Sequence, residues 1–244
     1  MNPQVEKLLS IPQYAQRSPE WYLQRENAIT ASDLPTVLGE NSYKTPWTLL
    51  VDKCNANPKP FVGNSATQWG THYEDIAIEK YSERYSKEVL SFGLLIHPEY
   101  QWLGGSPDGI TRDGILLEVK CPVSRKIIMG EVPHHYRSQV LLNLEICDLE
   151  VAHFIEFIPG KSDNDFILNV VEILRDREWF ARELPKIKEF WDSVLFYRRE
   201  GIQKHPKYRP PKAKPQQGIT LDISKAPEIK PKFIPFIDDP EETI

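Results

Sequence analysis

The sequence predicts an α/β protein in which helices flank a mixed, twisted central β-sheet on both sides. Apolar residues recur at helical spacing in three segments, residues 71–86, 133–146 and 176–200. Between these segments, residues 88–121 and 151–173 are expected to form the strands of the sheet. A chain of 244 residues with 40% apolar content is long enough to bury one substantial core.

The first predicted element is a short helix near the N-terminus. Ser18 is a residue type that caps helices, and the following Pro19 suits the first helical position. Proline is tolerated there because the N–H that it lacks has no helical partner at that position. The helix should therefore carry Trp21 and Arg25.

A second short helix and a surface loop are expected next. Thr30 and Asp33 have the spacing of a capping box, with Asp in place of the usual Glu or Gln, and this helix should end near Gly39. Residues 54–66 contain proline, glycine and asparagine in the pattern of a loop. The helix of residues 71–86 follows this loop.

The middle of the chain indicates strands joined by a tight turn. Residues 88–96 and 100–111 are expected to be two strands separated by a histidine and a proline. Residues 112–114, Arg-Asp-Gly, have turn character. The chain should return as a short strand over residues 115–121, which Pro122 closes.

The last third indicates a helix, a strand pair and a long helix. After the helix of residues 133–146, two strands at residues 151–158 and 166–173 should pair with each other. Asp176 is placed to cap a helix that ends at Gly201.

One side of this long helix should be lined by five apolar residues at spacings of three and four. A proline lies within the helix, at residue 185, and should bend or split it. The five apolar residues are Phe180, Leu184, Ile187, Trp191 and Leu195.

The composition predicts one domain followed by a tail. Residues 1–204 should form the domain, and the proline-rich residues 205–244 should lack a core of their own. This tail begins basic, carries an apolar patch at residues 233–237 and ends acidic.

The overall composition also bears on the setting of the protein. The net charge of −5 argues against binding nucleic acid by electrostatics alone. Three scattered cysteines form no disulfide or metal-binding pattern, no apolar run is long enough for a membrane span, and the N-terminus lacks the features of a signal peptide. We therefore expect an intracellular protein with no membrane partner.

Two acids and a lysine are expected to meet on the predicted hairpin. A three-residue turn ending at Gly114 places Asp108 opposite Glu118, and Lys120, two residues further along, shares their face of the sheet. A two-residue turn over Asp113 and Gly114 would instead place the two acids on opposite faces.

This arrangement suits metal-dependent chemistry. Carboxylates about 5 Å apart repel each other, and a bound Mg²⁺ removes that repulsion through the oxygen ligands that it prefers. The ammonium of Lys120 can orient a water molecule and stabilise charge on a phosphate. The alternative is a solvent-facing hairpin whose acids and lysine form weak cross-strand pairs.

The motifs taken together resemble a known family. Residues 105–109 with residues 118–122 are similar to the PD-(D/E)XK nuclease core, in the version of the lambda exonuclease and YqaJ-like viral recombinase family. Further segments fit in the family's order, and the resemblance covers about residues 15–160 and implies a restriction-endonuclease-like core. These segments are Trp21–Arg25 with Ile29–Ser32, Gly70–Glu74, and His135 and Tyr136 with Gln139.

The resemblance implies a Mg²⁺-dependent DNA exonuclease. It implies 5′→3′ degradation of linear double-stranded DNA with recognition of the 5′ phosphate, which leaves 3′ single strands for recombination or strand annealing. Candidate partners are double-stranded DNA ends, a homotrimeric ring of the same chain and a single-strand annealing protein. The basic start of the tail is expected to touch DNA, and the patch at residues 233–237 to dock on a neighbouring subunit or the annealing protein.

The resemblance also implies which residues hold the metal. Asp108, Glu118 and the carbonyl of Val119 would hold one Mg²⁺ ion, and Asp108 with Glu74 would hold a second, with Mn²⁺ as a substitute. We expect Glu74 in the first turn of its helix. Taken alone, Glu74 is equally consistent with an exposed acid near the positive end of the helix dipole.

The resemblance assigns water positioning to one residue of the predicted hairpin and one of the helix that follows it. Lys120 and Gln139 would position the attacking water. Tyr136 and Gln139 lie one helical turn apart and share a face, and in the family residues at such places contact the reacting phosphate or water. Without the resemblance, they are a half-buried helix face.

The 5′ phosphate is assigned to three other residues. Ser32 lies at a helix start, where free N–H groups and a hydroxyl can hold an anion, and Arg25 can add a two-pronged contact. The family uses this arrangement for the terminal phosphate, and Ser106 is placed with it as a DNA-binding residue. The alternative is a plain helix cap and a surface arginine.

Two other functions stay open. The same core occurs in RecB-type and restriction-like endonucleases, which would nick a covalently closed circle where an exonuclease would leave it intact. A DNA-end-binding adaptor without catalysis is the alternative from another class, and the complete set of Asp108, Glu118 and Lys120 speaks against it.

Overall fold

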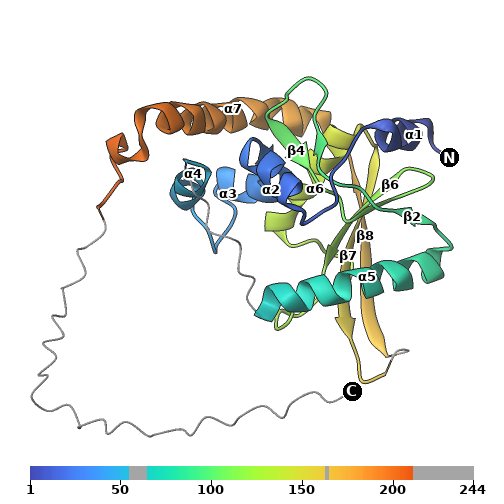
Figure 1. Cartoon of the computed structure of the whole chain (residues 1–244). Coiled ribbons are helices and arrows are strands. Elements are labelled where there is room, and N and C mark those ends of the chain that lie inside the picture. Colours follow the sequence, from blue (N-terminus) through green and yellow to red (C-terminus); the bar gives the residue numbers. More distant parts are fainter. Residues whose placement is uncertain (55–64, 163–164, 211–244) are drawn as a thin grey trace, which may run out of the picture. The chain divides into compact units, whose positions relative to one another are not determined.

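The structure is a computed structural model that describes residues 1–54, 65–162 and 165–210 (Figure 1). The expected loop of residues 54–66 and the expected tail of residues 205–244 lie mostly outside these ranges. In chain order the elements are α1 (Pro3–Ser10), α2 (Pro19–Glu26), β1 (Ile29–Thr30), the 3₁₀ helix η1 (Ala31–Asp33), α3 (Leu34–Val37), α4 (Pro46–Cys54), α5 (Ser65–Tyr85), β2 (Val89–Leu90), β3 (Leu95–Ile96), β4 (Leu103–Gly105), β5 (Gly109–Thr111), β6 (Ile115–Lys120), α6 (His134–Cys147), β7 (Val151–Pro159), β8 (Phe166–Leu174), α7 (Arg177–Glu200) and the 3₁₀ helix η2 (Ile202–Lys204).

The strands form two sheets rather than the single sheet that the sequence predicts. A five-stranded sheet has the order β2-β5-β6-β7-β8, in which β6 and β7 are parallel and the other pairs antiparallel. A three-stranded sheet has the order β1-β4-β3. The predicted strand of residues 100–111 is split between the two sheets, because Pro107 lacks the N–H that would continue a ladder.

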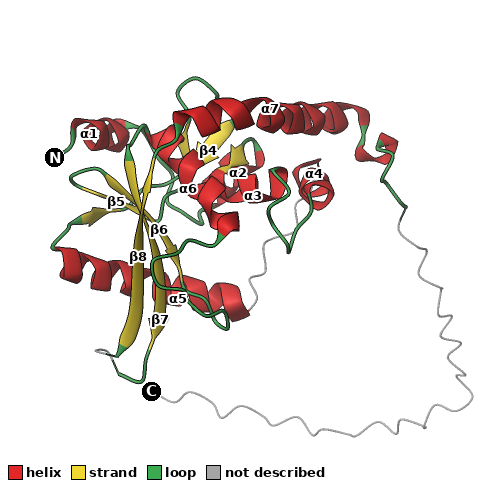
Figure 2. Ribbon diagram, turned by 180° about the vertical axis from the view of Figure 1, so that it is seen from behind, coloured by secondary structure: helices red, strands yellow, loops and turns green. Residues whose placement is uncertain are grey.

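Helices cover both faces of the larger sheet, as predicted. On one face Ala77 and Tyr81 of α5 pack with Leu117 of β6, and α5 crosses the strands in Figure 2. On the other face Leu116 of β6 belongs to the main core together with Leu142 of α6. Neighbouring residues of β6 thus point to opposite sides, as the pleat of a strand requires.

Both N-terminal helix starts are confirmed. The Ser18 hydroxyl accepts a hydrogen bond from the Trp21 N–H at 3.2 Å. Thr30 and Asp33 form the predicted capping box, in which the Thr30 N–H donates to the Asp33 carboxylate at 3.1 Å. Helix α3 ends just before Gly39, whose φ of 78° lies in the left-handed region that favours glycine.

Helix α5 begins earlier than predicted, at Ser65 rather than near Thr71. Gly70 and Thr71 are weak helix formers and resemble a helix start, but tertiary packing overrides this preference. Trp69 lies within the helix and packs against Tyr73, with ring centroids 4.5 Å apart, and Tyr73 in turn lies 6.2 Å from Phe157 of β7. The helix is therefore about two turns longer at its N-terminal end.

Helix α7 is continuous from Arg177 to Glu200, so the predicted split at Pro185 is wrong. Proline removes one helical hydrogen bond, and the burial of side chains on both sides of it holds the helix together. Of the predicted apolar face, Phe180, Ile187 and Trp191 are buried, whereas Leu195 is exposed. The Asp176 cap is present, with Asp176 Oδ1 2.8 Å from the Trp179 N–H.

The three cysteines are unpaired, as the sequence predicts. Within the described ranges, no helix combines the length and the apolar character needed to span a bilayer.

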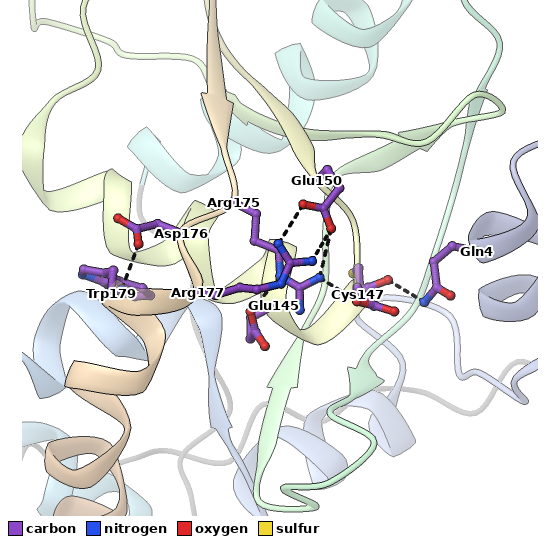
Figure 3. Close-up of polar contacts among 9 residues, drawn as sticks. Gln4, Glu145, Cys147, Glu150, Arg175, Asp176, Arg177 and Trp179 are labelled. Carbon is purple, nitrogen blue, oxygen red and sulfur yellow. Dashed lines mark hydrogen bonds and ion pairs between the residues drawn. The ribbon is translucent and has the colours of Figure 1, made fainter.

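One arginine joins the ends of four elements. The Arg175 side chain, only 7% exposed, donates to Glu145 at 2.8 Å and to Asp148 at 2.5 Å, and lies 3.4 Å from Glu150 (Figure 3). Arg177 also pairs with Glu150. Asp148 ends α6 with a φ of 52°, so Arg175 also holds a residue in left-handed backbone. The end of α6 is thereby joined to β7, β8 and α7.

We expect Arg175→Ala to lower the free energy of unfolding by about 2–4 kcal/mol, because it leaves the half-buried Glu145 carboxylate without its charged partner. Arg177→Ala is the matched control and should change it far less, since both members of that pair are exposed. Chemical denaturation of both variants measures the difference. Equal effects of the two substitutions would show that the buried position of Arg175 carries no special weight.

Candidate active site

The turn between β5 and β6 has the predicted three-residue form. Gly109 pairs with Leu117, and Gly114 has a φ of 97°. The ladder of β5 and β6 ends at Gly109, and just beyond it the Asp108 N–H donates to the Leu117 carbonyl at 3.2 Å. The two-residue turn, which would have separated the acids, is wrong.

The side chains of β6 alternate as the sequence predicts. Leu117 and Val119 pack in the apolar cluster under α5. Glu118 and Lys120 point to the opposite side and line a cavity that Asp108 also enters. The two acids and the lysine therefore meet in one place.

Glu118 is the buried centre of this group, with 0% of its surface exposed. Its Oε1 atom accepts hydrogen bonds from Lys120 Nζ and Gln139 Nε2, each at 2.5 Å, and its Oε2 atom accepts one from Asn143 Nδ2 at 3.2 Å. Burial raises the pKa of Glu118 to about 7, with Asp108 adding to the effect and Lys120 opposing it.

Asp108 and Glu74 complete a set of three acids. Asp108 Oδ2 accepts a hydrogen bond from the Val119 N–H at 2.6 Å, and burial raises the pKa of Asp108 against the opposing charge of Lys120. Burial also raises the pKa of Glu74 to about 7, and the Asp108 charge adds to it. Burial thus disfavours all three acids as anions, and neighbouring acids disfavour Glu74 and Glu118 further.

Glu74 reaches the cavity from a different place on its helix than expected. Because α5 begins at Ser65, Glu74 lies in the third turn, and the predicted first-turn position is wrong. The positive end of the helix dipole, which acts within the first turn, therefore does not act on Glu74. Its neighbours in the cavity set its charge.

The cavity has a volume of about 530 Å³ and joins the two predicted groups of residues. Its lining includes the three acids with Lys120 and Gln139, and also Arg25, Ser32 and Ser106.

The arginine and the serines are held together by a tryptophan. Arg25 Nη2 donates to the Ser32 hydroxyl at 2.8 Å, and the guanidinium lies over the Trp21 ring, 4.4 Å from its centroid. Trp21 Nε1 in turn donates to the Ser106 hydroxyl at 2.9 Å. Ser106 is two residues before Asp108, so this network connects the arginine to the segment that carries Asp108.

Tyr136 lies beside the cavity rather than in its wall. It lines an adjoining hollow together with Glu74, Lys120 and Gln139. Lys120 Nζ is 5.3 Å from the Tyr136 ring centroid, a distance that allows a cation–π contact. Tyr136 is therefore placed beside the lysine.

Asn143 is a site residue that the sequence analysis missed. It is fully buried, and its Oδ1 atom has no hydrogen-bond partner among the described residues. Its approach to Glu118 depends on Gly105, because a Cβ atom there would lie 2.3 Å from Asn143 Oδ1. The one signal in the sequence was its position, four residues after Gln139 and so on the same helix face.

The suitability of the acids for a metal can be judged from their donor atoms. Among the described residues, no three or more His, Cys, Asp or Glu side chains are grouped to hold a metal ion by themselves. The carboxyl oxygens of Asp108, Glu118 and Glu74 nevertheless have the chemistry that Mg²⁺ prefers, and a cation would relieve their mutual repulsion. Because Glu118 Oε1 is engaged by two donors, a cation there would replace at least one of them.

A family model matches more than half of the chain. The model of the YqaJ-like viral recombinase domain matches residues 20–150. The chain belongs to this family. An uncharacterized protein of Acanthamoeba polyphaga mimivirus, R354, is 35% identical over 185 residues, covering 68% of this chain and 34% of the relative. The uncharacterized protein YqaJ of Bacillus subtilis is 31% identical over 184 residues, covering 72% of this chain and 56% of the relative. The chain therefore spans about a third to a half of these relatives.

Solved structures share the fold of this family member. An alkaline exonuclease from Laribacter hongkongensis, LHK-Exo, has a TM-score of 0.65 at 22% identity, covering 75% of this chain and 95% of the other. A phage-related exonuclease from Haemophilus somnus has a TM-score of 0.53 at 17% identity, covering 71% and 94%. At these identities the likeness establishes the fold, and it confirms the predicted core with its mixed sheet and flanking helices.

The contact between Gly105 and Asn143 yields a prediction. Gly105→Ala should lower the free energy of unfolding by about 1–3 kcal/mol, because its methyl group overlaps the Asn143 amide. Gly104→Ala is the control and should cost less, since the atoms within 3.2 Å of its methyl group are the movable ends of Ile96 and Leu94. A double variant with Asn143→Ala should recover part of the loss in denaturation experiments. Additive effects of the two substitutions would contradict the proposed contact.

Proposed function

We propose that this chain carries a metal-dependent DNA exonuclease that degrades linear double-stranded DNA from 5′-phosphorylated ends and leaves 3′ single strands. The observation that carries the proposal is the single cavity that joins the acid–lysine group to the arginine–serine group. Family membership and the fold of LHK-Exo, whose structure was also solved in complex with dAMP, support it.

The size of the cavity favours a chain end over continuous DNA. A volume of about 530 Å³ is in the range of sites that enclose small molecules, and it has room for a terminal nucleotide rather than a duplex. With the terminal phosphate bound by Arg25 and Ser32, the next phosphodiester of the strand would lie near the acids. An anion-binding group in the same cavity as the acids would hold the end of the strand at a fixed place relative to them.

The proposed metal ligands are the acids of the cavity. One Mg²⁺ ion would be held by Asp108, Glu118 and the Val119 carbonyl, and a second by Asp108 and Glu74, with Mn²⁺ as a substitute. When bound, such a pair of ions stabilises the attacking and leaving oxygens of the phosphodiester. The burial of the three acids in one cavity supports this assignment. Burial raises their pKa values, and a bound cation would stabilise their ionised forms.

The remaining steps belong to side chains of this protein. Lys120 and Gln139, which both contact Glu118 Oε1, would orient the attacking water and stabilise the charge that develops on the phosphate. Both lie in the cavity wall and reach the same oxygen from β6 and α6. Tyr136 beside Lys120 would contact the DNA backbone. The trimeric ring and the annealing partner remain predictions from the resemblance, and the intracellular setting remains a prediction from the composition.

Removal of a proposed metal ligand tests the catalytic part. Asp108→Ala should lower the rate of degradation of linear duplex DNA in Mg²⁺ by about 10³-fold, and EDTA should abolish it. Asp192→Ala, which removes an exposed carboxylate on α7, is the control and should leave the rate unchanged. A closed circle should stay intact, and its nicking would point to an endonuclease. Full activity of Asp108→Ala would refute the assignment.

The choice of DNA end tests the recognition part. Linear duplexes with 5′-phosphate ends should be degraded faster than those with 5′-hydroxyl ends. Arg25→Ala should reduce this preference about tenfold or more, because charge-assisted hydrogen bonds of an arginine to a phosphate contribute roughly 1.5–3 kcal/mol. Arg25→Lys, which keeps the charge but lacks the fork of donors, should retain part of it. Equal rates on both ends of DNA with the unmodified protein would discard end recognition and leave the catalytic assignment standing.

A further inference from the structure

Arg17 is a second arginine of the cavity, and it lies outside every motif that marks the family resemblance. It belongs to the connection between α1 and α2 and has a φ of 68°, in the left-handed region that a residue with a side chain rarely adopts. Such a conformation persists where the surrounding structure imposes it, and it occurs preferentially at functional sites. We therefore asked what holds Arg17 and what it faces.

The connection that carries Arg17 is fastened to the strands by side-chain amides. Gln13 Oε1 accepts a hydrogen bond from the Gly93 N–H at 2.7 Å. Gln16 Nε2 donates to the Phe92 carbonyl at 2.9 Å and to the Pro107 carbonyl at 3.1 Å. Pro107 directly precedes Asp108, so the backbone beside Arg17 is tied to the backbone beside a proposed metal ligand. The position of Arg17 is thus set relative to the acids.

The guanidinium lies beside an acid of the cavity. Arg17 Nη2 is 3.3 Å from Glu74 Oε2, and both residues line the cavity together with Asp108 and Lys120. Half of the Arg17 side chain is exposed, compared with a quarter of the Glu74 side chain. The guanidinium has five N–H donors in a planar fork that matches a phosphate. The half-exposed guanidinium can therefore turn from Glu74 to a phosphate that enters the cavity.

We propose that Arg17 binds an internal phosphodiester of the DNA strand that enters the cavity, and that Glu74 and this phosphate compete for its guanidinium. The inference rests on the proposed function and adds a DNA-binding residue to it. Arg25 and Ser32, which are bonded to each other in the same cavity, remain the residues for the terminal phosphate. Because Glu74 is also a proposed metal ligand, a divalent cation and Arg17 draw on the same carboxylate. Arg17 should therefore contribute more to DNA binding when a divalent cation is present.

The competing explanation is that Arg17 only orients Glu74. In that case its loss would weaken metal binding and lower kcat while DNA affinity stayed the same. If Arg17 binds DNA, its loss raises Kd and KM for the duplex. The two explanations therefore differ in a binding measurement that involves no turnover.

The test uses three variants of the full chain. Arg17→Gly removes the guanidinium and places glycine at a positive φ, which glycine adopts without strain, so the variant should fold. Arg17→Lys keeps the charge without the fork. Arg112→Ala is the matched control, because Arg112 is also half exposed and also paired with a glutamate, Glu88, at 3.0 Å, but it lies outside the cavity lining. Thermal unfolding of each variant verifies folding.

The readout is the Kd for a fluorescent linear duplex with phosphorothioate ends, measured by anisotropy in EDTA and in Ca²⁺. In Ca²⁺, Arg17→Gly should raise Kd about tenfold for 5′-phosphate and 5′-hydroxyl ends alike, with a smaller rise in EDTA. Arg17→Lys should lie between Arg17→Gly and the unmodified protein, and Arg112→Ala should match the unmodified protein.

Two results would overturn the inference while leaving the proposed function intact. One is a Kd of Arg17→Gly in Ca²⁺ that lies within twofold of the Kd of the unmodified protein. In that case the unmodified protein would still prefer 5′-phosphate ends and degrade DNA in a metal-dependent way. The other is a loss of affinity confined to 5′-phosphorylated ends, which would make Arg17 a part of the terminal-phosphate site. Failure of the unmodified protein to bind or degrade linear duplexes would overturn the inference and the proposed function together.

Discussion

The buried carboxylate of Glu118 is the constraint on which the rest of the site depends. A charged group without any exposed surface needs compensating partners, and Glu118 has one from its own strand and two from α6. These contacts fix the distance and rotation of α6 relative to β6. They also require a glycine on β4, because Gly105 is the position that lets Asn143 approach. One carboxylate thereby joins elements of both sheets and the helix between them.

The interruption of a strand at Pro107 has an equally local origin and an equally wide effect. It sends β4 into the small sheet and β5 into the large one, and Asp108 lies at the point where they separate. The Asp108 carboxylate then bonds to the backbone of the facing strand instead of continuing the ladder. Trp21 of α2 bonds to Ser106 and Gln16 bonds to the Pro107 carbonyl, so α2, which carries Arg25, is attached at the same point. The proposed end-recognition and catalytic groups are therefore mechanically connected.

Charge balance unites the cavity. Three carboxyl groups face it together with the guanidinium groups of Arg17 and Arg25 and the ammonium of Lys120. Burial disfavours the ionised acids, and the charge of Asp108 raises the pKa of both Glu74 and Glu118. Divalent cations would stabilise the ionised acids of such a site, and an anionic substrate would in turn balance the charge of the cations and of the basic side chains. This balance of charge is the physical link between the arrangement of residues and the proposed hydrolysis of DNA, and it explains how a chain with a net charge of −5 can still take a polyanion as its substrate.

The sequence by itself determined the features that depend on neighbouring residues. Turn geometry at Gly114 set the register of β5 against β6, which brings Asp108 and Glu118 to the same cavity, and side-chain oxygens at Ser18, Thr30 and Asp176 set helix starts through hydrogen bonds that span three residues. Only the tertiary structure decided the features that depend on distant contacts. One is the true start of α5, which moved Glu74 away from a helix end: Trp69 packs against Tyr73, which in turn packs against Phe157 of β7. Asn143 and Arg17 became site residues because segments far apart in the chain hold them there, and no local pattern of residues encodes such a meeting.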